Sequence, residues 1–160
     1  RDVAMLKIGL SVGAIVVVLD QLTKWLIRDV VLDTARYIEV TGFFNIVEVW
    51  NRGVSFGLFA SASPWTPYLL SALAIAISIV LIVWLRKAET TFLALALGFV
   101  IGGAIGNVFD RFIWGRVYDF LDFHAAGYHW PAFNVADAAI SVGVGLILLD
   151  GFIAKRGDER

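Results

Sequence analysis

The sequence contains no cysteine, and this absence excludes several kinds of chemistry. Without cysteine the chain has no disulfide framework, no thiolate metal site and no cysteine nucleophile. Histidine is nearly absent as well, because His124 and His129 are the two in the chain, and they form neither an HExxH motif nor a carboxylate–histidine cluster in the sequence. We therefore do not expect a zinc hydrolase, and we assign no metal ligand and no cofactor.

Charged residues are also scarce. The chain has 13 Lys and Arg and 14 Asp and Glu, so that 17% of its 160 residues are charged while 59% are hydrophobic. A soluble domain of this length needs a polar surface that so few charges barely supply. The net charge of -1 gives no reason to expect nucleic acid as a partner. The composition indicates one integral membrane domain over residues 1–160.

Long apolar runs mark the segments that cross the membrane. A helix needs about 20 residues to span about 30 Å of hydrocarbon. The runs 68–85 and 90–109 carry no charge, whereas the run 8–19 must be extended to 27, past Asp20 and Lys24, and the run 138–154 is interrupted by Asp150. We predict an all-α bundle of four transmembrane helices at about 8–27, 67–85, 90–109 and 136–154.

The first run has a second interpretation, a cleaved signal peptide, because Arg1 and Lys7 precede an apolar stretch of suitable length. No small-x-small cleavage site follows this stretch, and the residues DQLTKW continue the helical pattern instead. We therefore favour a membrane span.

Four spans place both termini on the same side of the membrane. Basic residues in short segments near the span ends, such as Arg86 and Lys87, favour the cytoplasm for that side. The connections at about 28–66 and 110–135 are then outside. Indole rings favour the headgroup layer, and most of the tryptophans stand at or just beyond a predicted helix end: Trp25, Trp65, Trp84, Trp114 and Trp130.

The first outer connection has the pattern of a small sheet. Residues 37–50 alternate and are rich in β-branched and aromatic side chains, with Thr41-Gly42 as the turn. We predict two or three strands that lie on the membrane surface. The apolar side chains of this connection exceed what a two-stranded ribbon can bury, so we expect contact with the interface or with a lipid-bearing ligand: Phe43, Phe44, Phe56, Leu58 and Phe59.

Glycines recur every four residues in the third span. Gly98, Gly102 and Gly106 lie on one helical face, with Gly103 beside them. Small residues allow a neighbouring helix backbone to approach closely, so we interpret this face as a packing surface without chemistry.

Ionisable groups within the spans need a separate explanation, because a charge at the centre of the bilayer costs roughly 2.5–3.5 kcal/mol. Asp20 and Lys24 are four residues apart, and we interpret them as a structural clasp in preference to a catalytic pair. Asn107, Asp110 and Arg111 share a face at the end of the third span.

Further polar residues cluster near the start of the fourth span. Asn134 has the type and position of a helix N-cap, whereas Asp137 stands inside the apolar run, and Asp119 lies upstream in VYDFLDF. Two carboxylates held close together in a partly dehydrated site cannot both ionise, so one keeps its proton while the other acts as a base. Such a pair suits peptide hydrolysis by water.

A serine–lysine pair of Ser55 and Lys24 is the weaker nucleophilic alternative. The sequence around Ser55 is not a nucleophile elbow, and Lys24 already has Asp20 as a partner.

Five short blocks occur in order between residues 20 and 137: Asp20-Gln21-Leu22-Thr23-Lys24; Asn51-x-Gly53-x-x-Phe56; Gly102-Gly103-Ala104-Ile105-Gly106-Asn107-Val108-Phe109-Asp110-Arg111; Val117-Tyr118-Asp119-Phe120; and Phe133-Asn134-Val135-Ala136-Asp137. Together they resemble the signature blocks of the bacterial lipoprotein signal peptidases, the signal peptidase II family. One departure is Val54-Ser55, where many members of the family have two small residues; it alters substrate contacts at most.

The resemblance implies an aspartic endopeptidase of the bacterial inner membrane, with cytoplasmic termini, an active site near the periplasmic face and no cofactor. It would remove signal peptides from prolipoproteins by cutting on the N-terminal side of a diacylglyceryl-modified cysteine. Its partners would be that substrate, membrane lipid and the cyclic peptide inhibitor globomycin. By motif, the catalytic pair is Asp119 and Asp137. The other residues carried over are Asn51, Gly53, Asn107, Arg111 and Asn134 for substrate binding, and Asp20, Lys24, Asp110 and Phe133 as supporting residues.

Two rival functions use the same features. A small carrier or proton-relay protein would use Asp20, Lys24, Asp119 and Asp137 as a transport path, although the chain lacks an internal repeat and four spans leave little room for alternating access. A non-enzymatic assembly factor would rely on the glycine face alone.

Overall fold

The computed structural model describes residues 2–53 and 63–158, and within them it contains four helices that are long and apolar enough to cross a membrane. Helix α1 (Asp2–Leu26) continues into a short π-helical segment, η1 (Ile27–Val31). The others are α2 (Thr66–Arg86), α3 (Thr91–Trp114) and α4 (Val135–Asp158). The prediction of four spans is therefore confirmed.

Helix α3 extends beyond the predicted end at residue 109. It ends at Trp114, where Gly115 adopts the left-handed conformation with φ 67° and donates its backbone N–H to the carbonyl of Arg111. Glycine tolerates this conformation and commonly terminates helices. Asp110 and Arg111 therefore stand on the helix that carries Asn107, and not in the following connection.

A small antiparallel sheet accompanies the helices. Its strands are β1 (Tyr37–Thr41), β2 (Phe44–Asn51), β3 (Val117–Ala125) and β4 (Tyr128–His129), in the order β1-β2-β3-β4. The sheet in the described residues is thus larger than the two or three strands predicted, because the second outer connection supplies β3 and β4. The turn predicted at Thr41-Gly42 lies one residue later, at Gly42-Phe43, since Thr41 ends β1 and pairs with Phe44.

The aromatic side chains of the sheet are partly stacked and partly exposed. The ring of Phe44 lies 4.7 Å from that of Phe123, whereas Phe43 is mostly exposed. Phe56, Leu58 and Phe59, which the sequence also placed in this apolar surface, lie outside the described residues, as does Ser55 of the proposed serine–lysine pair.

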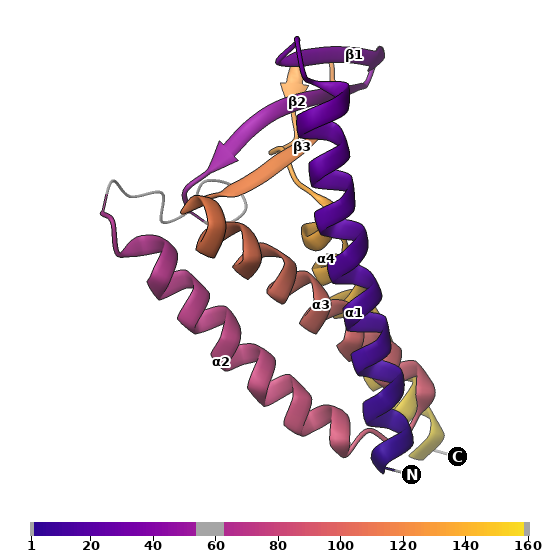
Figure 1. The fold of residues 1–160 in the computed structure, drawn as a ribbon. Coiled ribbons are helices and arrows are strands. Elements are labelled where there is room, and N and C mark those ends of the chain that lie inside the picture. The colour runs from indigo at the N-terminus through magenta and orange to yellow at the C-terminus, as the bar shows by residue number, and fades with distance from the viewer. Residues whose placement is uncertain (1, 54–62, 159–160) are drawn as a thin grey trace.

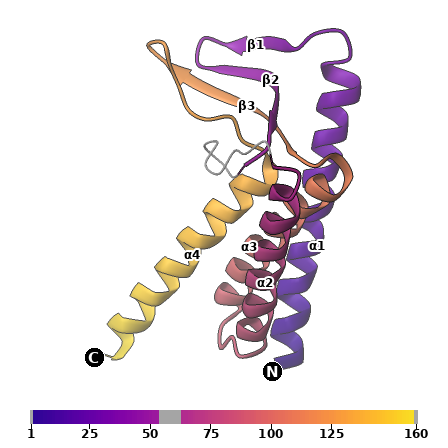
Figure 2. The same cartoon turned by 90° about the vertical axis from the view of Figure 1, so that its left-hand side faces the viewer.

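The sheet lies at one end of the helices (Figure 1). The start of α1 and the end of α4 lie at the opposite end, as four spans require (Figure 2). Helix α3 contacts each of the other three and is the most buried span.

The glycine face of α3 allows this close packing. A Cβ atom on Gly102 would stand 2.6 Å from the carbonyl oxygen of Gly13 in α1, and one on Gly103 would overlap the carbonyl oxygen of Ala136 in α4. Backbone atoms cannot move aside as side chains can, so the predicted packing surface is confirmed. It brings α1 and α4 against adjoining faces of α3.

The tip of the sheet holds a carboxylate–histidine contact that the sequence pattern did not reveal. Strands β3 and β4 pair His124 with His129, and Nδ1 of His129 lies 2.9 Å from Oδ1 of Asp122. Burial raises the pKa of Asp122, but hydrogen bonds from Asn45 and His129 outweigh it and hold that pKa below its usual value. Within the described residues no group of three acidic, histidine or cysteine side chains could hold a metal ion.

Candidate active site

Asp119 lies near the start of β3 and is almost completely buried, with 1% of its surface exposed. Its backbone pairs with Val49 of β2. Its Oδ1 accepts a hydrogen bond of 2.8 Å from Nδ2 of Asn134, and it forms a second side-chain hydrogen bond with Asn51. The ends of two strands and the start of α4 therefore meet at this carboxyl group.

These surroundings raise the pKa of Asp119 to about 8. Burial is the largest cause, because it penalises the charged form, and the negative charge of Asp137 is the second. The hydrogen bonds with Asn51 and Asn134 and the charge of Lys24 oppose the shift but do not cancel it. Asp119 therefore holds a proton at neutral pH.

Asp137 lies in the first turn of α4, where it forms a reciprocal cap with Asn134. The backbone N–H of Asp137 donates to Oδ1 of Asn134 at 2.9 Å, and the backbone N–H of Asn134 donates to Oδ2 of Asp137 at 3.3 Å. This arrangement satisfies N–H groups that a helix start leaves unpaired. The N-cap interpretation of Asn134 is correct, and the same side chain also binds Asp119.

Asn107 connects this helix start to α3. Its Nδ2 donates to Oδ1 of Asp137 at 2.9 Å, and its Oδ1 accepts from Nδ2 of Asn134 at 3.1 Å. The two asparagines therefore link the carboxyl groups of Asp119 and Asp137 in one hydrogen-bonded chain. An amide can donate and accept at once, so each carboxyl group has a fixed orientation whichever of them is ionised.

Asp137 is half-buried and reaches a cavity of about 540 Å³. The rest of this cavity is mainly apolar, formed by the segment before α4 and by the outer face of that helix; its walls include Trp130, Phe133, Ile140 and Ser141. One of the two carboxyl groups thus faces an open apolar space, while the other lies in the interior.

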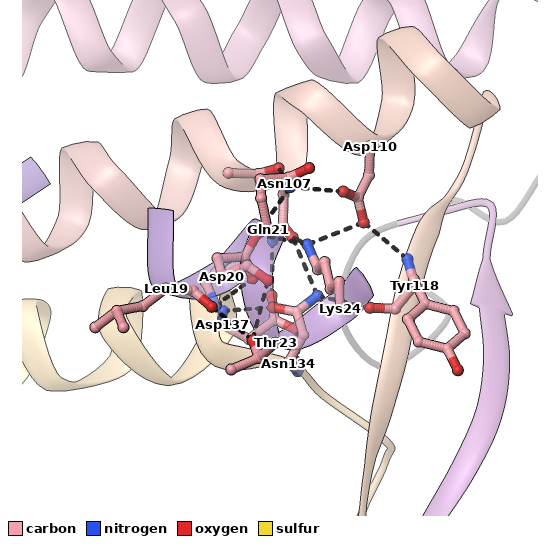
Figure 3. Close-up of polar contacts among 12 residues, drawn as sticks. Leu19, Asp20, Gln21, Thr23, Lys24, Asn107, Asp110, Tyr118, Asn134 and Asp137 are labelled. Carbon is pink, nitrogen blue, oxygen red and sulfur yellow. Dashed lines mark hydrogen bonds and ion pairs between the residues drawn. The ribbon is translucent and has the colours of Figure 1, made fainter. Parts of the chain in front are cut away.

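A buried ionic cluster lies next to this pair (Figure 3). Nζ of Lys24 stands 2.7 Å from Oδ2 of Asp20 and 2.9 Å from Oδ2 of Asp110, and it donates to Oδ1 of Asn107 at 3.2 Å. Asp20, Lys24 and Asp110 are each no more than 2% exposed. The contact predicted between Asp20 and Lys24 is confirmed, and Lys24 also reaches α3.

The buried ionic cluster is hydrogen-bonded to the elements that carry Asp119 and Asp137. Oδ1 of Asp20 accepts from the backbone N–H of Ala136 at 2.9 Å, which links α1 to the first turn of α4. Oδ2 of Asp110 accepts from the backbone N–H of Tyr118 at 3.0 Å, which holds the residue next to Asp119. Removing one partner would leave an uncompensated buried charge.

Gln21 is a member of this cluster to which the sequence assigned no role. Its Nε2 lies 2.9 Å from Oδ1 of Asp110, 3.1 Å from Oδ2 of Asp20 and 3.1 Å from the carbonyl oxygen of Gly106. An uncharged amide inside an apolar run was the signal that could have identified it.

Arg111 and Gly53 meet at the end of β2. The Arg111 guanidinium donates from Nη2 to the carbonyl oxygen of Gly53 at 3.2 Å, and the backbone N–H of Gly53 donates to Oδ1 of Asn51 at 2.9 Å. Since Asn51 also binds Asp119, these three residues lie on the sheet side of the pair. Together with Asn107 and Asn134, they lie around the carboxyl pair, and their role in substrate binding stays a prediction.

Phe133 supports the site through its backbone. Its carbonyl oxygen accepts from the N–H groups of Phe120 and Leu121, and its own N–H donates to the carbonyl oxygen of Leu121 at 3.1 Å. These bonds attach the segment before Asn134 to β3, next to Asp119. Phe133 therefore lies beside β3, and its supporting role in the site stays a prediction.

Two solved structures share this fold. One, described as a bacterial membrane enzyme at 2.3 Å resolution, superposes with a TM-score of 0.80 and 28% sequence identity, over 95% of this chain and 91% of the other. A second bacterial membrane enzyme, at 1.9 Å resolution, has a TM-score of 0.74 and 30% identity, over 89% of this chain and 90% of the other. The fold is therefore that of a multi-pass bacterial membrane enzyme.

Sequence relatives identify the family to which this membrane enzyme fold belongs. The family model described as signal peptidase (SPase) II matches residues 12–153. The lipoprotein signal peptidase of Ralstonia nicotianae is 46% identical over 146 residues, which cover 88% of this chain and 82% of that protein. That of Alteromonas mediterranea is 39% identical over 153 residues, 94% of this chain and 82% of that protein. The chain belongs to the signal peptidase II family and is therefore a peptidase.

Proposed function

We propose that this chain is an aspartic endopeptidase that removes signal peptides from prolipoproteins, cutting on the N-terminal side of a diacylglyceryl-modified cysteine. The observation that carries the proposal is the linked pair of Asp119 and Asp137. One carboxyl group is buried with a raised pKa, and the other faces an open cavity, which is the division between acid and base that peptide hydrolysis requires.

In the proposed reaction Asp137 takes a proton from a water molecule as its oxygen attacks the scissile carbonyl carbon. Asp119 gives its proton to the carbonyl oxygen, so that a neutral gem-diol forms. The C–N bond then breaks: the leaving nitrogen takes the proton from Asp137, and one hydroxyl group of the gem-diol returns a proton to Asp119. Both carboxyl groups regain their starting states, and no cofactor takes part.

The neighbouring polar groups would bind the substrate backbone. The Arg111 guanidinium donates to the carbonyl oxygen of Gly53 at 3.2 Å, and Asn51 contacts both Gly53 and Asp119. A peptide laid along the end of β2 would meet backbone and amide groups at this edge. We therefore assign substrate positioning to Asn51, Gly53 and Arg111, together with Asn107 and Asn134, which orient the carboxyl pair.

The apolar cavity beside Asp137 supports a lipid-bearing substrate. Its walls, which include Trp130 and Ile140, suit an acyl chain or an apolar signal-peptide side chain better than a polar peptide. We further propose that the protein lies in the bacterial inner membrane with cytoplasmic termini and with the sheet on the periplasmic side, and that globomycin inhibits it.

The carrier or proton-relay alternative would use the same carboxylates. In the structure Asp20 and Asp110 are both bound to Lys24, and membership of a peptidase family favours hydrolysis over transport. We therefore retain the peptidase as the proposed function.

The test is a cleavage assay with purified protein in detergent and a diacylglyceryl-modified prolipoprotein, followed by the gel shift that accompanies loss of the signal peptide. We expect cleavage by the wild-type protein and by Asp150→Asn, which changes a carboxyl group at the far end of α4. Asp119→Asn and Asp137→Asn should each abolish cleavage. Equal cleavage of the unlipidated prolipoprotein would refute the proposed specificity, and retained cleavage by either site variant would refute the pair.

A further inference from the structure

A second cavity, of about 510 Å³, lies at the sheet end of the bundle, and none of its described lining residues also lines the cavity beside Asp137. It is bounded by the end of β2, the start of α2 and the connection between α3 and β3. Its walls include two arginines, Arg52 and Arg116, and two aromatic residues, Tyr68 and Trp114. None of the functions considered above assigns a role to it.

Arg116 is fixed by aromatic stacking. Its Cζ atom lies 4.5 Å from the centre of the Trp50 ring, a distance typical of a cation–π contact. Trp50 in turn contacts the rings of Trp114 at 5.8 Å and Tyr118 at 4.9 Å. A stacked guanidinium keeps its N–H groups available at its edge, so Arg116 is ordered without using the donors that an anion needs.

In the part of the chain that the structure describes, the two arginines of this cavity have no acidic partner. Among the described residues neither forms an ion pair, and no carboxylate lines the cavity. Other arginines on the same side differ: Arg28 binds Asp29 through two hydrogen bonds of 2.7 Å, and Arg36 stands 3.9 Å from Glu48. Two uncompensated cations in one concave site favour an anionic ligand.

The level of the cavity identifies the source of that anion. Helix α2 begins at Thr66 and helix α3 ends at Trp114, so the cavity lies where two apolar helices end. The rings of Trp65 and Tyr68 lie 6.2 Å apart at the same level, and such side chains occupy the headgroup layer of a membrane. Phospholipid headgroups are the anions that a protein meets at this level of a membrane.

We propose that this cavity binds the headgroup of an anionic phospholipid, with Arg52 and Arg116 as ligands of its phosphate. A zwitterionic headgroup fits less well, because its ammonium group would find no acidic partner among the described lining residues. Arg52 stands between Asn51 and Gly53 in the sequence, so a bound lipid also anchors the end of β2 beside the candidate active site. The proposal concerns binding and does not depend on the peptidase reaction.

The test measures thermal stability of the purified full chain in a neutral detergent during titration with short-chain phosphatidylglycerol. We expect a saturable rise in Tm for the wild-type protein. Arg52→Gln and Arg116→Gln should each raise the lipid concentration for half of this rise by about fivefold, the effect expected for one basic side chain at a lipid surface. Arg36→Gln, which removes an exposed arginine outside the cavity, should leave it unchanged.

Three results would overturn the proposal. An equal effect of Arg36→Gln would indicate diffuse surface charge, an equal response to phosphatidylcholine would remove the selectivity, and saturation by inorganic phosphate alone would indicate a free-phosphate site. If Arg116→Gln fails to fold because its contact with Trp50 is lost, Arg52→Gln carries the test, since Arg52 is exposed. Arg116→Lys keeps the charge but not the planar fork, and should fall between wild type and Arg116→Gln.

Discussion

Burial and the neighbouring negative charge of Asp137 raise the pKa of Asp119. They outweigh the hydrogen bonds with Asn51 and Asn134, which lower it. The result is a carboxyl group that stays neutral at physiological pH. Its partner Asp137 is half-buried, accepts two N–H donors and faces a cavity that water can enter. Because the surroundings of Asp119 and Asp137 differ, the same residue type can provide both an acid and a base.

The raised pKa of Asp119 predicts how stability depends on pH. Between its unfolded value of about 4 and its folded value of about 8, the folded protein holds a proton that the unfolded chain has released. The free energy of unfolding of the wild type therefore falls as pH rises through this window. Asp119→Asn cannot ionise, so it should exceed the wild type in Tm, by a margin that grows from pH 5 to about pH 8 and then levels off.

Thermal unfolding in detergent across this pH range measures that margin directly. A difference in Tm that stays constant with pH, or that shrinks as pH rises, would contradict the assignment of the proton to Asp119.

At the scale of elements, the glycine face of α3 sets the distance between the helices that carry the site. Gly103 touches the backbone of Ala136, which itself donates to Asp20, so the packing contact and the ionic cluster lie at the same point of α4. The position of Asp137 therefore depends on the absence of a side chain on the opposite helix.

A pair of Gly→Ala substitutions tests this dependence. An alanine normally stabilises a helix interior by roughly 0.5–1 kcal/mol relative to glycine. Gly145→Ala, where a Cβ atom would meet nothing within 4 Å, should show that small gain or no change. Gly103→Ala should instead lower Tm and reduce cleavage, because its Cβ atom would meet a carbonyl oxygen. Equal Tm values for the two variants would show that α3 and α4 are not packed as described.

The helices could be predicted from the sequence, whereas one of the strands could not. The four helices follow from long apolar runs, and the contact of Asp20 with Lys24 follows from their spacing of four. Strand β3 was missed because it is buried on both faces: Val117, Tyr118, Asp119 and Phe120 are all buried, so the period-two alternation of a one-sided strand is absent.

The rest of the site depends on contacts between residues far apart in the sequence. Gln21 reaches Asp110, and Asn45 reaches Asp122, across 89 and 77 residues respectively. No local pattern of residues in the sequence indicates a contact over such a separation. The proposed catalytic pair was assigned by motif resemblance, since spacing alone does not bring residue 119 to residue 137.

For the whole molecule, the arrangement predicts a single orientation in the membrane. The sheet lies at one end, and the start of α1 and the end of α4 lie at the other (Figure 1). Asp119 belongs to β3 of this sheet, and Asp137 lies in the first turn of α4. A topology reporter fused after Arg160 should report a cytoplasmic location. The same reporter inserted at the exposed turn at Gly42 should report a periplasmic location. The opposite pattern would place the site on the wrong side for exported substrates.

The central claim is that Asp119 and Asp137 act as one catalytic unit, and single-turnover cleavage of a bound diacylglyceryl prolipoprotein tests it most directly. Residues that act as a unit give non-additive losses when they are removed together. We predict that Asp119→Asn and Asp137→Asn each retain bound substrate but keep only a small residual rate of cleavage, and that the double variant is no slower than either. Cleavage by a single variant near the wild-type rate, or losses that multiply in the double variant, would contradict the account.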